Sequence, residues 1–310
     1  SYNGERNIIL HSDIAFHGKL LGSLSVSSAS ENSFVFPKIK FGKKYKFNDT
    51  KNLEDTVKKY KKKIFAVIVE PYSASTYKEN STEFLQKCRT LCDKYNIKLI
   101  FDEIYTGFFK TGPLFNFMRT SIVPDIVVYS KSFGGGKSSI SGYTTTKALF
   151  NSSYGNTNDA LMHSTTYNAF GEETLTAIVA IEVAIEEEFE KKSKNLQNLL
   201  ETGFKKLSER YEFFHSFAGM GALYGLEFEL PELYKQLEKI FQNLDKKFFK
   251  KLYVGALIDH LYSEHNILTY FTDNKKVCLA ISPSLITTEK DINNLFDSLD
   301  KTFDKNQFSL

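Results

Sequence analysis

Three short apolar runs constrain the fold of this chain more than any other feature of its sequence. They cover residues 64–69, 98–101 and 125–129, and each is rich in Ile, Val or Phe and continuous rather than alternating. Continuous apolar runs of this length are typical of strands that are buried on both faces of a parallel sheet. The runs therefore predict an α/β fold with a mostly parallel sheet.

A helix is predicted between the first two runs. Asn80 can cap it, and Glu83 stands where a capping box requires an acidic residue. Apolar side chains then recur at helical spacing at positions 84, 88, 91, 92 and 95. Strand, helix and strand form a βαβ unit, which places ligand-binding loops at the carboxyl ends of its strands.

The second half of the chain indicates a change of domain. A long helical pattern runs from Thr174 to about Tyr211 and becomes strongly charged after Glu186. Beyond it, alternating stretches cover residues 223–230, 267–271 and 277–281, and a final helix is expected near Thr288 with Asp291 in a capping box. We expect a large α/β domain over residues 1–190 and a smaller α+β domain over residues 191–310.

Charge and cysteine content exclude several classes of protein. The chain has 40 basic and 37 acidic residues with the two signs interleaved, and no basic stripe that would indicate a nucleic-acid partner. Its three cysteines do not suggest a disulfide framework or a metal site. Neither an apolar signal core nor a run of the ~20 apolar residues that a membrane span needs is present. We expect a cytoplasmic protein without a membrane segment.

Two strand ends carry the chemical signal. Asp102 ends the second apolar run, and Lys131 follows the third, just before three glycines at 134–136. Either feature alone is weak, and the lysine lacks the residue order of a phosphate-binding loop. Together they suit pyridoxal 5′-phosphate (PLP), which needs an amine to form a Schiff base and a carboxylate against its ring nitrogen. Both would lie at the same edge of the sheet.

Five segments of the chain resemble the signature motifs of the class-III aminotransferases, in that family's order. They are residues 16–22 (FHGKLLG), 67–71 (VIVEP), 102–115 (DEIYTGFFKTGPLF), 124–136 (PDIVVYSKSFGGG) and 163–167 (HSTTY). The family includes the ornithine, acetylornithine and γ-aminobutyrate enzymes. The resemblance implies PLP-dependent transferase fold type I.

The resemblance also implies roles at the cofactor ring. Lys131 should form the Schiff base and then shuttle a proton, and Asp102 should pair with the ring nitrogen. Phe16 should stack on one face of the ring with His17 beside it, and Ile104 should pack against the other face. For Phe16, a plain core aromatic is the alternative interpretation.

Three further residues are assigned in the same way. Tyr105 replaces the usual Gln near the ring hydroxyl, and a phenol can donate the same hydrogen bond. Thr166 should reach the cofactor phosphate of a neighbouring subunit, which implies a homodimer with shared active sites, unless it is only a surface hydroxyl. Glu70 should support the site, or it is a structural carboxylate at a strand end.

The chain departs from the family pattern in two places. Ala280 stands where many members carry an Arg that binds a substrate carboxylate, and Ser75 stands where its Glu partner often lies. We therefore expect an acceptor other than a standard α-keto acid, such as an aldehyde, an ω-amine partner or a larger acyl substrate. The phosphate-binding loop of the family should precede Ser1, so we expect the large domain to be incomplete at its N-terminus.

The expected function is the transfer of an amino group between an amine or amino acid donor and an aldehyde or keto acceptor. Two alternatives remain open. One is an aminomutase or decarboxylase that uses the same cofactor and fold. The other is a catalytically incomplete domain of a larger protein.

Overall fold

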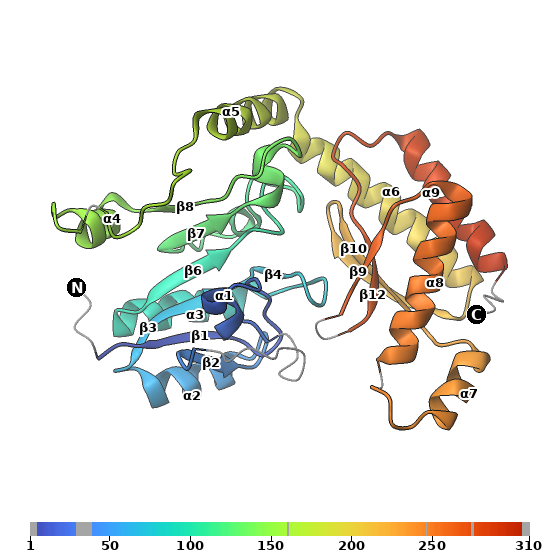
Figure 1. Cartoon of the computed structure of the whole chain (residues 1–310), viewed down its shortest axis with the longest axis horizontal. Coiled ribbons are helices and arrows are strands. Elements are labelled where there is room, and N and C mark those ends of the chain that lie inside the picture. Colours follow the sequence, from blue (N-terminus) through green and yellow to red (C-terminus); the bar gives the residue numbers. More distant parts are fainter. Residues whose placement is uncertain (1–4, 29–38, 160, 246, 274–275, 306–310) are drawn as a thin grey trace. The chain divides into compact units, whose positions relative to one another are not determined.

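The computed structural model describes residues 5–28, 39–159, 161–245, 247–273 and 276–305 (Figure 1). The chain divides into two compact units, one of residues 1–74 and 79–188 and the other of residues 75–78 and 189–310. The sequence predicts a domain boundary between residues 190 and 191. The contacts place it between residues 188 and 189 and assign the short segment Ser75–Lys78 to the second unit.

The first unit is built on a six-stranded sheet with the order β2-β1-β3-β6-β7-β8. Its strands are β1 (Ile8–Ser12), β2 (Gly42–Tyr45), β3 (Ile64–Val69), β6 (Lys98–Asp102), β7 (Ile126–Tyr129) and β8 (Gly142–Thr145). All neighbours are parallel except β7 and β8. The three strands predicted from apolar runs are confirmed as β3, β6 and β7, and they are neighbours in the sheet.

Helices α2 (Thr50–Tyr60) and α3 (Thr82–Tyr95) pack with this sheet into one apolar core (Figure 1). The predicted cap of α3 is wrong by one residue. Ser81 is the N-cap, because its hydroxyl accepts a hydrogen bond from the backbone N–H of Phe84. Asn80 instead donates from its side-chain amide to the backbone carbonyl of Glu70.

The remaining elements of the first unit are short, apart from one helix. They are α1 (Leu21–Ser25), β4 (Tyr72–Ser73), β5 (Lys78–Glu79, which spans the unit boundary), η1 (Asn116–Arg119), η2 (Lys131–Gly134), α4 (Lys147–Tyr154) and α5 (Gly171–Glu186).

The predicted long helix over residues 174–211 is wrong, because the chain forms two helices there. Helix α5 ends at Glu186 and α6 (Phe189–Arg210) begins beyond Glu187 and Glu188. Glu188 has a φ of 53°, in the left-handed region that helices do not use. Three consecutive glutamates at a helix C-terminus also oppose the helix dipole. Backbone conformation and charge therefore both end α5 here.

The second unit is an antiparallel sheet with helices, which is the α+β organisation that the sequence predicts. Its strand order is β11-β12-β10-β9. The elements besides α6 are β9 (Phe214–Met220), β10 (Leu223–Phe228), α7 (Glu232–Ile240), α8 (Phe248–His265), β11 (Tyr270–Thr272), β12 (Cys278–Ile281) and α9 (Glu289–Asp304). Rings of Phe204, Phe214, Phe228 and Phe303 form part of its core. The capping box of Thr288 and Asp291 at α9 is confirmed.

A search of the helices in the described part of the chain finds none that combines the length and the apolar character of a membrane span.

Candidate active site

The candidate site lies at the carboxyl edge of the parallel sheet. Asp102 is the last residue of β6, and Lys131 opens the 3-10 turn η2, which is separated from β7 by Ser130 alone. The two strands are parallel, and Asp102 pairs in register with Val128. Parallel strands present their carboxyl ends at one edge, so the topology brings the amine and the carboxylate to the same side of the sheet.

Asp102 and His17 form a buried pair. Nδ1 of His17 donates to Oδ2 of Asp102 over 2.7 Å, and the backbone N–H of Ile104 donates to Oδ1 over 3.0 Å. Burial alone would lower the pKa of His17, but the hydrogen bond and charge of Asp102 and the charge of Glu70 raise it above 6.5. Nε2 of His17 is buried without a hydrogen-bond partner among the described residues.

Glu70, directly after β3, ties the loop that carries Phe16 and His17 to the sheet. Its Oε2 accepts from the backbone N–H of Phe16 over 3.0 Å, and its Oε1 accepts from that of Ala74 over 3.1 Å. Burial raises the pKa of Glu70 to about 7, and the nearby charge of Asp102 adds to this rise. Glu70 therefore positions Phe16 through the backbone.

Lys131 has a left-handed backbone conformation, and the pKa of its amine is lowered. Its φ is 49°, in the left-handed region, where strained residues often mark functional sites. Its Nζ lies 5.1 Å from the centre of the Tyr105 ring. The residue as a whole is exposed, yet surrounding atoms desolvate its ammonium and lower its pKa below 10.5, against the charges of Asp102 and Glu70. A larger share of the amine is then neutral and nucleophilic near neutral pH.

The structure brings together seven of the predicted site residues and leaves one apart. The linked residues are Phe16, His17, Glu70, Asp102, Ile104, Tyr105 and Lys131. Thr166 is exposed, and none of the contacts of the described residues links it to this group.

Sequence reasoning missed the groups that support the site. It assigned no role to Glu103, although this residue follows Asp102 directly and is fully buried. It also missed the rings of Phe108, Tyr129 and Phe133, which pack against one another; Tyr129 and Phe133 flank Lys131 in the sequence. The density of aromatic residues between positions 108 and 133 was the available signal.

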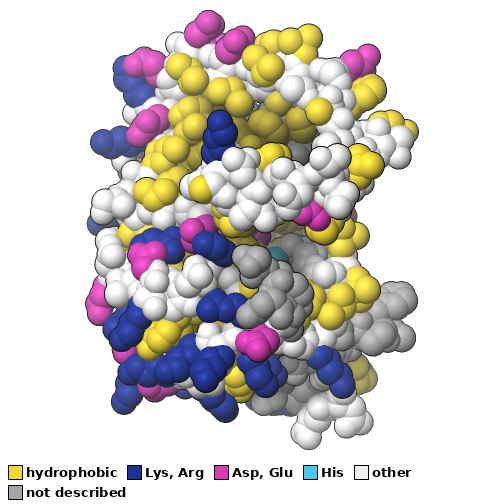
Figure 2. Space-filling model, turned by 90° about the vertical axis from the view of Figure 1, so that its left-hand side faces the viewer, with side chains coloured by type: hydrophobic (Ala, Val, Ile, Leu, Met, Phe, Trp, Pro, Cys, Tyr) yellow, Lys and Arg dark blue, Asp and Glu magenta, His cyan; other side chains and the backbone are white. Residues whose placement is uncertain are grey.

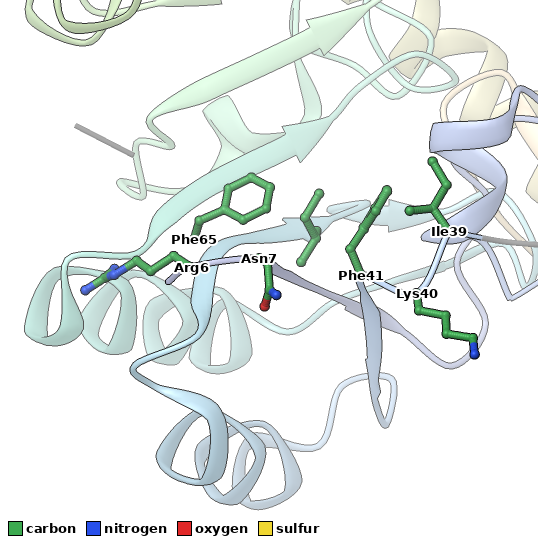
Figure 3. Close-up of a pocket in the computed structure, with 7 residues that line it drawn as sticks. Arg6, Asn7, Ile39, Lys40, Phe41 and Phe65 are labelled. Carbon is green, nitrogen blue, oxygen red and sulfur yellow. The ribbon is translucent and has the colours of Figure 1, made fainter. Parts of the chain in front are cut away.

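A pocket of about 500 Å³ lies elsewhere in the first unit (Figure 3). Apolar side chains of Ile9, Ile39, Phe41 and Phe65 line it together with Arg6, Asn7 and Lys40. The guanidinium of Arg6 donates to the backbone carbonyls of Ile64, Tyr95 and Asn96. None of the predicted site residues lines this pocket.

The architecture is that of PLP-dependent transferase fold type I. A transaminase from the marine bacterium Virgibacillus superposes with a TM-score of 0.83 at 18% identity, over 97% of this chain and 68% of that one. The ornithine aminotransferase of Toxoplasma gondii, whose structure is described with partial occupancy of PLP at the active site, superposes with a TM-score of 0.78 at 19% identity, over 96% and 64%.

The sequence comparison gives the family. The model of the aminotransferase class-III family matches residues 1–303, so the chain belongs to this family, whose members depend on PLP. Acetylornithine aminotransferase of Clostridium acetobutylicum is 32% identical over 248 residues, which cover 76% of this chain and 59% of the relative. Aminotransferase PigE of a Serratia species is 25% identical over 315 residues, which cover 90% and 36%. The chain thus spans about half the length of the curated relatives that it matches.

Proposed function

We propose that this chain carries the catalytic lysine of a PLP-dependent aminotransferase. The reaction moves an amino group between an amine or amino acid donor and an aldehyde or keto acceptor. The observation that carries the proposal is that Lys131 and the buried Asp102 lie at the same carboxyl edge of the sheet, at the ends of the neighbouring parallel strands β7 and β6. Family membership supports it, because it supplies the cofactor that such a pair suits.

The residues of this edge fit PLP. The cofactor, when bound, supplies a carbonyl that takes up the amino group and a ring that withdraws electrons from the reacting carbon. The buried, hydrogen-bonded pair of His17 and Asp102 is suited to face a protonated ring nitrogen. Phe16 and Ile104 are the residues that would bind the two ring faces, and Tyr105 is the donor that would meet the ring hydroxyl.

Lys131 has two tasks in this proposal. Its Nζ would hold the cofactor when this is bound, and the free amine would take and return a proton of the substrate. An ordinary lysine is too basic for the second task near neutral pH. Burial lowers the pKa of Lys131 and brings it closer to the range in which an amine both accepts and donates a proton.

The attachment can be tested by spectroscopy and mapping. The chain is mixed with PLP, the visible absorbance of the bound cofactor is recorded, and borohydride is added to fix the cofactor for mass spectrometry. We expect the label on Lys131 and the loss of the band in Lys131→Ala. Lys110 is the matched control, because burial lowers its pKa as well, to about 8. A label on Lys110, or a band that survives in Lys131→Ala, would refute the proposal.

We also propose that the chain functions as a homodimer in which Thr166 reaches the neighbouring active site. Residues 161–170 are all exposed. Residue 160, just before them, lies outside the described part of the chain. Large apolar side chains are exposed there and along α5, namely Leu161, Met162, Tyr167, Phe170, Leu175, Ile178, Val179, Val183 and Ile185. Figure 2 shows hydrophobic side chains gathered around a hollow in the upper part of one face. Apolar surface of this extent is typical of an interface between proteins.

The substrate proposal rests on the second unit. Ala280 is buried on β12 opposite Gly225 of β10, and Ser75 is also buried, so neither position offers a cation or a carboxylate. We propose an acceptor that is not bound through an α-carboxylate clamp. Half-reactions with a panel of amines, aldehydes and keto acids test this, and fast turnover restricted to ornithine-type donors with α-keto acids would contradict it. Product analysis with a single substrate separates transfer from the aminomutase and decarboxylase alternatives.

We further propose that the protein works in a reducing compartment such as the cytoplasm. Cys88, Cys92 and Cys278 are all free and buried, which supports this assignment.

A further inference from the structure

The carboxylate of Glu103 holds together the loop that follows β6, and Glu103 has no catalytic role in the function proposed above. The side chain is fully buried. Its Oε2 accepts from the hydroxyl of Thr106 and from the backbone N–H of Asn116 over 3.0 Å, and its Oε1 accepts from the backbone N–H of Phe117 over 2.8 Å. Burial raises the pKa of Glu103 to about 7, and the three donors oppose this rise because they favour the ionised carboxylate, which only accepts hydrogen bonds. The contacts join both ends of the loop over residues 104–116.

Glu103 is also fixed to the sheet on its own backbone. Its N–H donates to the carbonyl of Val128 in β7 over 2.9 Å, and its carbonyl accepts from the N–H of Gly107 over 2.9 Å. The residue therefore connects three parts of the unit: the end of β6, the carboxyl-terminal part of β7 and the loop that follows β6. A displacement of its side chain would release the far end of the loop while the near end stays in place.

The loop carries groups that touch the lysine segment. Tyr105 presents its ring to the Lys131 amine at 5.1 Å. Phe108 stacks on Phe133 of η2 with ring centres 5.0 Å apart, and Phe115 lies 5.7 Å from Tyr129, the last residue of β7. The turn that begins with Lys131 thus rests on rings that the loop supplies.

We propose that Glu103 is a positioning residue for Lys131, which acts by holding the aromatic loop against the turn that presents the amine. This inference rests on the proposed function only for the catalytic role of the Lys131 amine. The carboxylate does not touch the amine, so its effect passes through Tyr105, Phe108 and Phe133. If the loop loosens, water reaches the amine more easily.

The test measures the reactivity of Lys131 without cofactor. Trace acetylation with acetic anhydride over a pH series, read by mass spectrometry of the peptide that contains Lys131, gives the apparent pKa of this amine. Exposed Lys51 in the same samples is the internal reference. In Glu103→Gln we expect the pKa to rise by about half to one unit, so labelling near neutral pH falls ~3- to 10-fold. The matched control is Glu209→Gln at an exposed position of α6.

The direction of the change separates positioning from simple charge. Removal of a negative charge lowers the pKa of a nearby lysine, whereas renewed hydration raises it. The groups whose charges act on Lys131 are Asp102 and Glu70, and both stay in place in the variant. A Glu103→Gln protein with wild-type circular dichroism and an unchanged or lowered pKa of Lys131 would overturn the proposal.

A second variant keeps the proposal testable if Glu103→Gln does not fold. Thr106→Val removes one donor to the carboxylate and leaves the two backbone donors, so we expect a smaller shift in the same direction. An unchanged profile in folded Thr106→Val would then overturn the inference. Because acetic anhydride labels any neutral amine, a wild-type chain that fails to bind PLP would count against the proposed function and leave this comparison intact.

Discussion

Asp102 and His17 are buried together, and each supplies a hydrogen-bond partner for the other. Their 2.7 Å contact is joined by the backbone N–H of Ile104, and Glu70 accepts two further backbone N–H groups nearby. A buried charge without such partners is costly. Each of these buried groups depends on its neighbours for hydrogen bonds, so the loss of one side chain leaves another without a partner.

Replacement of His17 tests this dependence. We expect His17→Leu to lower the free energy of unfolding by about 1.5–3 kcal/mol, because the buried carboxyl group of Asp102 then loses its side-chain hydrogen-bond donor. Urea denaturation followed by circular dichroism measures the change. His215 is the control, because its ring is 58% exposed in a contact with Glu229, and His215→Leu should stay within about 0.5 kcal/mol. Equal effects of the two variants would contradict the prediction.

The same residues predict how stability depends on pH. Burial raises the pKa of Glu70 to about 7, and the raised pKa of His17 acts in the same direction. A group with a raised pKa in the folded state contributes stability that is complete below its ordinary pKa and is lost as the pH rises through the folded value. We expect wild type to lose on the order of 1–3 kcal/mol between about pH 4.5 and about pH 7.5 relative to Glu70→Gln, because the ordinary pKa of a glutamate is 4.5 and the folded value is about 7.

Urea unfolding of both proteins across this pH range checks the prediction. The difference between the two proteins is the informative quantity, because every other titrating group is common to both. Parallel stability curves would show that Glu70 does not titrate in this range.

At the scale of elements, the apolar pattern of the sequence was sufficient to predict strands whose burial in the sheet dominates. It was not sufficient to choose between two adjacent residues that can both cap a helix. β3, β6 and β7 could be predicted because their apolar runs match strands buried in a sheet. The cap of α3 could not, because Asn80 and Ser81 both suit an N-cap and only packing selects between them. Phe84 is fully buried against Tyr45, and its backbone N–H then meets the Ser81 hydroxyl.

The candidate site shows the same division. The placement of Lys131 and Asp102 at one sheet edge could be predicted, because both follow strands of a parallel sheet and such strands end at the same edge. Glu103 could not, because the sequence does not tell which backbone donors its carboxylate meets at residues 116 and 117. The end of α5 could not be predicted either. The sequence shows the charge of Glu187 and Glu188 but not that the helix stops before them.

The cap of α3 provides a prediction at this scale. Ser81→Ala should lower the free energy of unfolding by about 1 kcal/mol, because the first turn of the helix loses a side-chain acceptor. Ser208→Ala is the control, since this hydroxyl lies inside α6 and donates to the carbonyl of Lys205. Denaturation with urea should show a loss only for Ser81→Ala. A loss for both would point to a general effect of serine removal.

At the scale of the molecule, each unit encloses an apolar core, but one helix of the first unit buries little of its apolar surface. The second unit encloses a cluster of phenylalanine rings, whereas the first has a helix, α5, in which only Ala177 and Ala184 are buried. An exposed apolar helix is unfavourable in water, so this helix requires a covering surface.

Self-association can be measured directly. In sedimentation velocity over a range of concentrations, we expect the wild-type chain to move as an assembly larger than one chain. Ile178→Asp should shift it toward the monomer by placing a charge on α5. Leu268→Asp is the control, because Leu268 is 83% exposed in the second unit. A monomeric wild type at all concentrations, or equal dissociation by both substitutions, would contradict the homodimer proposal.

The backbone at position 131 has a consequence for stability. Its φ of 49° suits glycine, and a side chain there bears a conformational penalty of about 1–2 kcal/mol. Lys131→Gly relieves this penalty, whereas Lys131→Ala retains it, so the glycine variant should unfold at a higher urea concentration than the alanine variant.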